Sequence, residues 1–340
     1  MKVLLIGLGS IGQRHLRNLH KINPNFKFLA LRKIYKVPIL TDKLKISKNK
    51  KSLKEKYNIK YFKDLDVALE YKPKFAVICS PTSLHLEQTI KCLKKNVNVF
   101  IEKPLSHNKK RLNELKKILL RKKKIIYMMG YKTRFNPLYI FLKKYLKKKN
   151  LGKINHVEIF NGEHIADFHK YEDYKTSFAA RKKLGGGVVL TLIHEIDYFL
   201  DLFSNYKIKI ISSNISKNSK LDIDVEDTLN SSFLVRNKRE KFTVNLHLNY
   251  YTRPKKRYIK IISDKGTIFV DFNKNYFQKF VNKSTLKRKF LFSRNLKFIN
   301  EMKFFVKHIK ENKYIGKNLS IYNGIKTLQL ALNLKGESNV

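Results

Sequence analysis

The feature that most constrains the fold is a glycine-rich turn directly after an apolar segment at the start of the chain. Residues 3–6 are Val-Leu-Leu-Ile, and residues 7–12 read Gly-Leu-Gly-Ser-Ile-Gly, a G-x-G-x-x-G pattern. Between a strand and a helix, Gly7 allows a tight turn, Gly9 lets a pyrophosphate approach the backbone, and Gly12 permits close helix–strand packing. The helix N-terminus then offers free N–H groups to the phosphates. The pattern predicts a dinucleotide site, and a purely structural glycine turn is the alternative.

The first 130 residues alternate between apolar runs and segments of helical periodicity. The runs are Val3–Ile6, Phe26–Leu31, Phe75–Cys79, Val97–Ile101 and Ile125–Met129. The helical faces are Ile11, Leu16 and Leu19, then Leu84, Ile90 and Leu93, then Leu112, Leu115 and Leu119. Wholly apolar strands alternating with helices predict a doubly wound parallel sheet, covered by helices on both faces, as in a Rossmann fold. The lysine-rich residues 41–58 fit this scheme poorly, and we interpret them as an insertion or a solvated helix.

After residue 130 the pattern changes to strands that alternate apolar and polar residues, as half-buried antiparallel strands do. These expected strands are His156–Phe160, Ile208–Ile211, Thr228–Val235, Phe242–Tyr251, Tyr258–Ile262 and Thr267–Phe272. Helices are expected at residues 136–149, at Val188–Phe203 and at Tyr322–Leu334. We therefore expect a dinucleotide-binding domain at residues 1–130 and a second α/β domain, for substrate binding and oligomerisation, at residues 131–340.

The charge of the chain is strongly positive, with 74 Lys and Arg against 26 Asp and Glu and a net charge of +48. The lysines are spread along the whole sequence, which we interpret as the composition bias of an AT-rich genome. Salt-sensitive sticking to nucleic acid is expected, but no specific nucleic-acid partner. No apolar run approaches the roughly 20 residues that span a bilayer, so no membrane association is expected. The two cysteines, Cys79 and Cys92, predict buried thiols and a cytoplasmic protein.

The residues after the second expected strand bear on cofactor choice. Residues 30–33 are Ala-Leu-Arg-Lys, and no carboxylate follows until Asp42. An NAD site usually places an acidic residue there for the ribose hydroxyls, and an acid would repel a 2′-phosphate. Arg32 could instead pair with that phosphate through two hydrogen bonds. We therefore predict NADP(H) as the preferred cofactor, with NAD(H) as the alternative.

Five motifs occur in an order that resembles a known family. They are the glycine turn, Ser80-Pro81-Thr82-Ser83-Leu84-His85, Glu102-Lys103-Pro104, Gly130-Tyr131 with Arg134-Phe135-Asn136-Pro137, and Gly185-Gly186-Gly187 with His194 and Asp197. Together they resemble the Gfo/Idh/MocA family of oxidoreductases (glucose–fructose oxidoreductase, inositol dehydrogenase, rhizopine catabolism). The resemblance implies a Rossmann domain followed by an α/β domain with an open, mostly antiparallel sheet, whose face often forms dimers or tetramers. Asp167, residues 171–174 and residues 177–181 look like a subgroup acting on sugars or nucleotide sugars.

The resemblance also implies that Lys103 and His194 lie beside the nicotinamide and the substrate carbinol. Histidine titrates near neutrality and suits general-base work, and a lysine ammonium can stabilise the oxygen as its charge develops. Many relatives carry an aspartate where this chain has Thr191, and Asp197 either orients His194 instead or serves to cap or pack. Expected cofactor contacts are Gly7, Gly9, Ser10, Ile11, Gly12, Arg32, Ser80, Pro81, Thr82, His85, Glu102 and Lys103. Expected substrate contacts are Lys103, Tyr174, Arg181, Thr191 and His194.

These patterns predict an NAD(P)-dependent oxidoreductase acting on a secondary alcohol or ketone of a sugar, cyclitol or nucleotide sugar. A dinucleotide-binding sensor or scaffold without turnover is the alternative. Thr191 supports this alternative, because many relatives have an aspartate at that position. No metal is predicted, because none of the ten histidines has a metal-ligand spacing with cysteine or a carboxylate. A homo-oligomer, dimer or tetramer, is expected.

Overall fold

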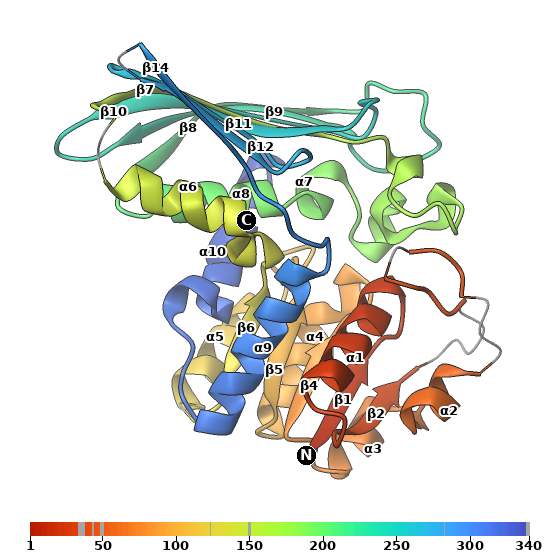
Figure 1. Cartoon of the computed structure of the whole chain (residues 1–340). Helices are drawn as coiled ribbons and strands as arrows, with labels where there is room; N and C mark the ends of the chain where they lie inside the picture. Colours follow the sequence, from red (N-terminus) through yellow and green to blue (C-terminus); the bar gives the residue numbers. More distant parts are fainter. Residues whose placement is uncertain are drawn as a thin grey trace.

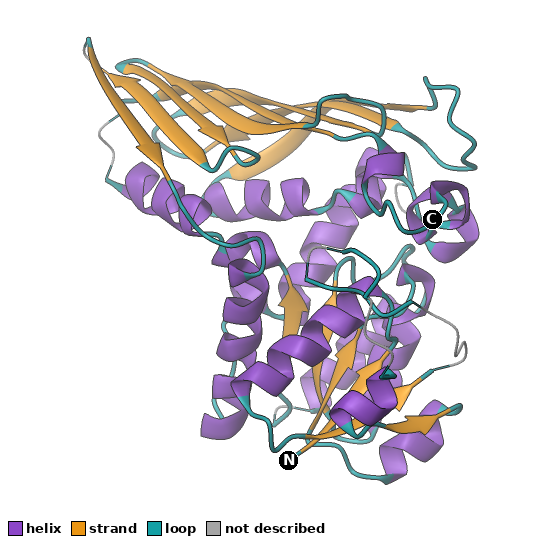
Figure 2. Cartoon of the chain, turned by 45° about the vertical axis from the view of Figure 1, so that its right-hand side comes forward, coloured by secondary structure: helices purple, strands orange, loops and turns teal. Residues whose placement is uncertain are grey.

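The computed structural model describes residues 1–32, 38–42, 44–47, 51–122, 124–148, 151–281 and 283–337. Two layers are stacked on one another (Figure 1). The lower layer is a sheet with helices on both of its faces. The upper layer is a broad sheet with helices only on the face that looks down at the lower layer (Figure 2). The chain passes from the lower to the upper layer and then returns to the lower one.

The lower sheet has six parallel strands in the order β3-β2-β1-β4-β5-β6. The strands are β1 Lys2–Ile6, β2 Lys27–Leu31, β3 Lys60–Phe62, β4 Phe75–Ile78, β5 Asn98–Glu102 and β6 Tyr127–Gly130. The helices between them are α1 Ser10–Ile22, α2 Leu53–Tyr57, α3 Leu65–Glu70, α4 Thr82–Lys94 and α5 Leu112–Arg121. The strand order reverses between β1 and β4, and ligands bind at such a switch point in open α/β sheets. The predicted Rossmann architecture is confirmed.

Three details of the lower layer differ from the sequence-based expectation. Leu84 is 39% exposed, and Leu86 takes the buried place on α4, because the helix begins at Thr82 and the apolar face is set from there. The short strand β3 was not anticipated, since only three residues pair and the first is a lysine. Part of the lysine-rich segment forms α2, which Ser52 caps through a capping box; residues 43 and 48–50 lie outside the described residues.

The upper sheet has eight strands in the order β14-β13-β12-β11-β7-β10-β9-β8, and its neighbours are antiparallel except for the parallel pair β7–β10. The strands are β7 Ile154–Gly162, β8 Lys207–Ser216, β9 Thr228–Arg236, β10 Lys241–Asn249, β11 Lys256–Ser263, β12 Gly266–Asp271, β13 Tyr276–Val281 and β14 Ser284–Lys289. Buried and exposed residues alternate along β10 and β12. The expected open, mostly antiparallel sheet is confirmed, although β13 and β14 were not anticipated.

The second half of the chain contributes five α-helices to the described structure. They are α6 Pro137–Lys147, α7 Val188–Thr191, α8 His194–Leu202, α9 Leu296–Glu311 and α10 Ile321–Leu334. Short 3-10 turns lie at η1 Lys132–Phe135, η2 Ile165–Asp167, η3 Tyr174–Thr176, η4 Phe178–Ala180, η5 Lys182–Leu184 and η6 Lys317–Leu319. No helix of the described residues is both long and apolar enough to cross a membrane.

The helix expected at Val188–Phe203 is interrupted between α7 and α8. In a continuous helix the carbonyl of Thr191 would accept the N–H of Glu195. That N–H instead donates to the Leu192 carbonyl at 3.2 Å, and the Thr191 carbonyl accepts a hydrogen bond of 2.6 Å from Nζ of Lys103. The expected single helix is therefore two helices, and the Thr191 carbonyl at the break accepts a tertiary hydrogen bond in place of a helical one.

Helix α9 returns the chain to the lower layer and packs against α1. Met302 and Phe305 join the same buried cluster as Phe75 and Phe100, and the ring centroids of Phe305 and Phe75 lie 5.4 Å apart. The late segment of the chain thus completes the core of the first domain. The domain boundary at residue 130 stays a prediction, with α9 as a later contributor to the first core.

We predict that Phe305→Ala lowers the free energy of unfolding of the lower layer by about 3–5 kcal/mol, because it leaves a cavity among buried rings. Urea denaturation followed by circular dichroism measures the loss. The matched control is Lys303→Ala, which removes an exposed side chain from the same helix. Equal denaturation curves for the two variants would contradict the packing of α9 in this core.

Candidate active site

The glycine turn has the geometry that phosphate binding requires. Gly7 adopts a φ of +97°, and a Cβ on Gly12 would lie 2.2 Å from the Gly7 carbonyl oxygen, so both positions demand glycine. A Cβ on Gly9 would meet nothing within 4 Å, so its backbone borders open space. Helix α1 begins at Ser10 without a side-chain cap, which leaves its first N–H groups available.

Two loops at the carboxyl ends of β4 and β5 are joined through His85. One ring nitrogen of His85 lies 2.7 Å from the Pro104 carbonyl oxygen, and the other lies 2.8 Å from that of Ser80. Both nitrogens are thereby engaged, so the imidazole holds the two loops together. The Ser80 hydroxyl donates to Gln88, and Thr82 is buried at the start of α4. The sequence assigned these residues to the cofactor, and in the structure both ring nitrogens of His85 contact backbone carbonyls.

Arg32 lies at the carboxyl end of β2, where the sequence placed it. Its guanidinium lies beside Tyr61, with Nη1 3.4 Å from the phenol oxygen. The guanidinium carbon is 5.7 Å from the centre of the Tyr61 ring. Lys33 lies outside the described residues. Arg32 is thus held at the edge of the sheet that carries the glycine turn, where the ribose of a bound dinucleotide is placed in this fold.

A cavity of about 520 Å³ lies between the two layers. Its wall includes Lys103 after β5, Thr191 and His194 of the broken helix, and Tyr174 of the long loop after β7. The structure thus brings together four of the five expected substrate contacts. Arg181 is not in the wall; it donates to the Lys175 carbonyl at 2.5 Å and lies 3.7 Å from Asp222.

Lys103 and His194 differ in how their polar atoms are satisfied. Lys103 donates to the Thr191 carbonyl, and burial lowers the pKa of its amino group. His194 is 5% exposed, and neither of its ring nitrogens has a hydrogen-bond partner among the described residues. Burial lowers the pKa of His194 well below its usual value, and the cations Lys132 and Lys103 lower it further. The imidazole is therefore uncharged at neutral pH, and both of its nitrogens are buried without a hydrogen-bond partner in the described part of the chain.

Asp197 does not orient His194 in this structure. Its carboxylate pairs with the guanidinium of Arg134 at 2.6 Å and accepts a hydrogen bond of 2.8 Å from Asn323. Arg134 also pairs with Asp201, whose carboxylate lies 2.6 Å from Lys143. This buried network ties α8 to η1, α6 and α10. We therefore correct the catalytic assignment of Asp197 to the structural alternative, because its oxygens already have partners other than the imidazole.

Two cationic residues in the cavity wall were not anticipated from the sequence. Arg257 of β11 pairs with the buried Glu195 at 2.5 Å and donates to Thr133 at 3.3 Å. Lys132 follows β6, and its Nζ lies 5.0 Å from the centre of the Phe298 ring. Neither residue belongs to a spacing pattern, because their neighbours lie on other elements. Only a structure or an alignment of relatives could have indicated them.

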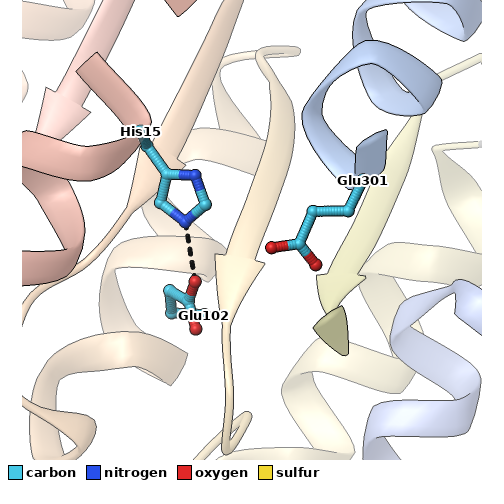
Figure 3. Close-up of side chains that lie close together, drawn as sticks. All are labelled: His15, Glu102 and Glu301. Atoms are coloured by element: carbon cyan, nitrogen blue, oxygen red, sulfur yellow. Dashed lines mark hydrogen bonds and ion pairs between the residues drawn. The ribbon is translucent and has the colours of Figure 1, made fainter. Parts of the chain in front are cut away.

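His15, Glu102 and Glu301 form a buried cluster (Figure 3). Nε2 of His15 lies 2.7 Å from a Glu102 oxygen. Burial alone would raise the pKa of Glu102, but the His15 hydrogen bond and nearby cations hold it below its usual value. The pair links α1, which carries the glycine turn, to the end of β5 and so to Lys103. Glu102, which we expected to contact the cofactor, thus connects α1 to the strand end that carries Lys103.

Glu301 of α9 points toward this pair, and neither of its oxygens has a partner among the described residues. One possible ligand atom from each of the three residues lies within 4.8 Å of the others. Spacing along the sequence did not indicate the grouping, because the residues come from three distant elements. Lys132 and Lys297 lie close enough to act on Glu301, and such cations oppose a divalent ion. The absence of a metal stays a prediction.

Comparison with known proteins identifies the first domain. Residues 1–131 match the model of the Gfo/Idh/MocA oxidoreductase family, described as having an NAD-binding Rossmann fold. Residues 1–131 are thus similar to the Rossmann domain of this family. The resemblance inferred from the five sequence motifs is thereby confirmed, and the NAD-binding Rossmann fold of the family agrees with the glycine turn and the strand order.

Curated relatives match only part of the chain. It is 31% identical to myo-inositol 2-dehydrogenase of Thermotoga maritima over 157 residues, which cover 45% of this chain and 42% of the relative. It is 26% identical to 4-carboxy-2-hydroxymuconate-6-semialdehyde dehydrogenase of Sphingobium sp. over 224 residues, which cover 63% and 61% of the two chains. The chain thus spans less than two thirds of the length of these curated relatives.

Solved structures of similar fold cover nearly the whole chain. Myo-inositol 2-dehydrogenase from Lactobacillus plantarum superposes with a TM-score of 0.76 at 20% identity and covers 100% of this chain and 97% of its own. A levoglucosan dehydrogenase in complex with NADH and levoglucosan gives a TM-score of 0.77 at 16% identity, with coverage of 99% and 96%. At these identities the likeness concerns the fold, which is shared through both layers.

We predict that Glu301→Gln stabilises the protein at pH 8 but not at pH 4. Burial, followed by the charge of Glu102, raises the pKa of Glu301 well above its usual value. With the folded pKa above the unfolded one, stability is complete below the unfolded pKa and declines as the pH rises towards the folded pKa. The amide removes this loss, which at pH 8 is on the order of 1–3 kcal/mol.

Denaturant unfolding at the two pH values measures the difference. Glu311→Gln, an exposed site on the same helix, serves as the control and should show no such pH dependence. If Glu301→Gln destabilises the protein at pH 8, the carboxylate is charged and held by the neighbouring lysines, and our interpretation of Glu301 as a neutral acid is wrong.

Proposed function

We propose that this protein is an NAD(P)-dependent oxidoreductase that transfers hydride between the nicotinamide and a secondary alcohol or ketone of a sugar, cyclitol or nucleotide sugar. The observation that carries the proposal is the meeting of Lys103 and His194 in one cavity above the dinucleotide-binding domain. The chain's own residues fit the cofactor: the open space beside Gly9 and the free N–H groups of α1 suit a pyrophosphate.

When bound, the nicotinamide supplies the hydride acceptor or donor. The neutral imidazole of His194 accepts the hydroxyl proton of the alcohol, since its low pKa leaves a nitrogen lone pair free. The Lys103 amino group hydrogen-bonds the same oxygen and stabilises its developing negative charge. In the reverse direction the proton returns from His194 to the oxygen.

The carbonyl of Thr191 holds Lys103 in place for this role. Without that 2.6 Å hydrogen bond the amino group would have several rotamers to choose from. Thr191 thus contributes through its backbone, and an aspartate at this position is not required for the contact. This favours the enzyme over the alternative of a dinucleotide-binding sensor or scaffold without turnover.

The finer assignments belong to the same proposal. NADP(H) is the preferred cofactor, on account of Arg32 at the end of β2. The helix-free face of the upper sheet, with its long paired strands, forms the contact of a homodimer or homotetramer. The buried free thiols of Cys79 and Cys92 suit a reducing compartment, so we place the protein in the cytoplasm, with no specific nucleic acid and no membrane as partners.

We predict that Lys103→Met and His194→Ala each lower kcat by about 10²–10⁴-fold, because each removes a proton-transfer or charge-stabilising contact. A screen of cyclitols and sugars with NAD⁺ and NADP⁺ finds the substrate, and nicotinamide absorbance measures the rate. NADH affinity should change by no more than a few-fold. Lys265→Met, in the exposed turn after β11, is the control. Full activity in both site variants would contradict this mechanism. Binding of the dinucleotide by the unchanged protein without turnover of any substrate would favour the sensor.

We predict that NADPH binds more tightly than NADH by about tenfold or more, since a charge-assisted pair with the 2′-phosphate contributes that much. Nicotinamide fluorescence titrations at high salt, with free pyrophosphate as a competitor, measure both affinities. Arg32→Asp should reverse the order. Tighter binding of NADH to the unchanged protein would refute the assignment of Arg32 while leaving the dinucleotide site intact.

A further inference from the structure

The inner wall of the cavity carries lysines without carboxylate partners. Lys132 of η1 and Lys297 in the first turn of α9 both line it, together with Lys103. Lys103 donates to a carbonyl, and Lys132 faces the Phe298 ring. Within the described part of the chain, neither Lys132 nor Lys297 has an ion pair with an acidic side chain. Arg294 adds a further cation at the exposed rim.

The acidic side chains of the same cavity compensate these charges only in part, because each has a partner of its own. The pairs are Glu163–Lys255 at 3.6 Å, Asp167–Arg253 at 2.9 Å, Glu172–His169 at 2.7 Å and Glu195–Arg257 at 2.5 Å. Glu102 is hydrogen-bonded by His15 and offsets part of the charge of Lys132, and the raised pKa of Glu301 favours its neutral form. The wall around Lys132 and Lys297 is therefore left with a net positive charge.

An uncompensated cluster of cations in a partly buried wall is costly unless a ligand supplies the opposite charge. Burial lowers the pKa of Lys132, and Lys103 and Lys297 lower it further. Burial, Arg257 and Arg294 lower the pKa of Lys297 to about 8. The two lysines therefore repel one another and their neighbours. An anion placed between them would relieve both the burial and the repulsion.

The phosphates of the dinucleotide do not neutralise these lysines. None of the residues 7–12 of the glycine turn lines the cavity, and neither does Arg32. The lysines lie instead on the same cavity as Lys103 and His194, which we assign to the reacting carbon. Lys132 and Lys297 come from the lower layer, whereas His194 comes from the upper one. A ligand in the cavity can thus present its carbinol to His194 and an anionic group to the lysines.

We propose that the substrate carries an anionic group, a carboxylate or a phosphate, which Lys132 and Lys297 bind. This deepens the proposed function and rests on it: the protein acts on an acidic sugar or sugar phosphate in preference to a neutral cyclitol. Lys132 and Lys297 are the specificity-determining residues. They contact the anionic group and take no part in the transfer of hydride or of the proton.

The test measures anion binding to the protein already saturated with its nicotinamide cofactor. The probes are D-glucuronate, D-glucose 6-phosphate and inorganic phosphate, with neutral D-glucose for comparison, at constant ionic strength. Isothermal titration calorimetry should show saturable binding of at least one anion and much weaker binding of D-glucose. The anion that binds more tightly, carboxylate or phosphate, identifies the group.

Two variants make the assignment specific. The double variant Lys132→Met/Lys297→Met should lose anion affinity by about tenfold or more and keep its cofactor affinity. Lys303→Met, an exposed lysine on the same helix, removes a positive charge without touching the cavity and should bind the anions as the unchanged protein does. Circular dichroism checks that the double variant is folded, and the single variants Lys132→Met and Lys297→Met replace it where it is not.

The outcomes are distinguishable. Loss of anion binding in the double variant alone supports the proposal. Absence of saturable anion binding to the unchanged protein, or an equal loss in Lys303→Met, overturns it while the oxidoreductase assignment stands. A fall in cofactor affinity in the double variant also overturns it and assigns the lysines to the nicotinamide. Failure of the unchanged protein to bind either nicotinamide dinucleotide removes the proposed function itself.

Discussion

The hydrogen bond from Lys103 to the carbonyl of Thr191 is the contact on which the site depends. It joins the end of β5 in the lower layer to the end of α7 under the upper sheet, across 88 residues of sequence. By occupying that carbonyl it ends α7 and lets a new helix begin at His194. The imidazole therefore starts α8 at the cavity, beside the lysine that holds the preceding helix. One contact thus sets the interface between the layers and the spacing of the two proposed catalytic residues.

Burial of charge organises the rest of the molecule around this contact. Most buried acids are matched to a base: Glu102 to His15, Asp197 to Arg134, and Glu195 to Arg257. Each of these pairs also joins separate elements, so the ion pairs hold α1, η1, α8 and β11 to their neighbours. Breaking one partner of such a pair would leave a buried charge, which destabilises a fold by about 3–5 kcal/mol. Four groups have no partner of opposite charge or no hydrogen-bond partner within the described ranges: Glu301, Lys132, Lys297 and His194.

The unmatched groups fall into three kinds. Protonation of Glu301 lowers the free-energy cost of burying it, since a protonated carboxylic acid is neutral. For Lys132 and Lys297 this burial cost falls only when the ammonium group loses a proton or binds an anion. His194 is already neutral, and its open nitrogens suit a ligand hydroxyl. A cavity that combines a neutral base with unpaired cations fits an acidic alcohol better than a neutral one.

The sequence by itself determined the Rossmann sheet and the glycine turn, because apolar runs, helical periods and short motifs are local features of the chain. Through the family resemblance it also indicated Lys103 and His194 as candidate catalytic residues. It did not reveal the break at Thr191, the return of α9 to the first core, the partner of Asp197 or the grouping of Glu301 with His15 and Glu102. Each of these depends on atoms from elements far apart in the chain, whose meeting is decided by packing. Local patterns predict the helices and strands. Only the tertiary structure decided which charged side chains are paired and which line the cavity without a partner.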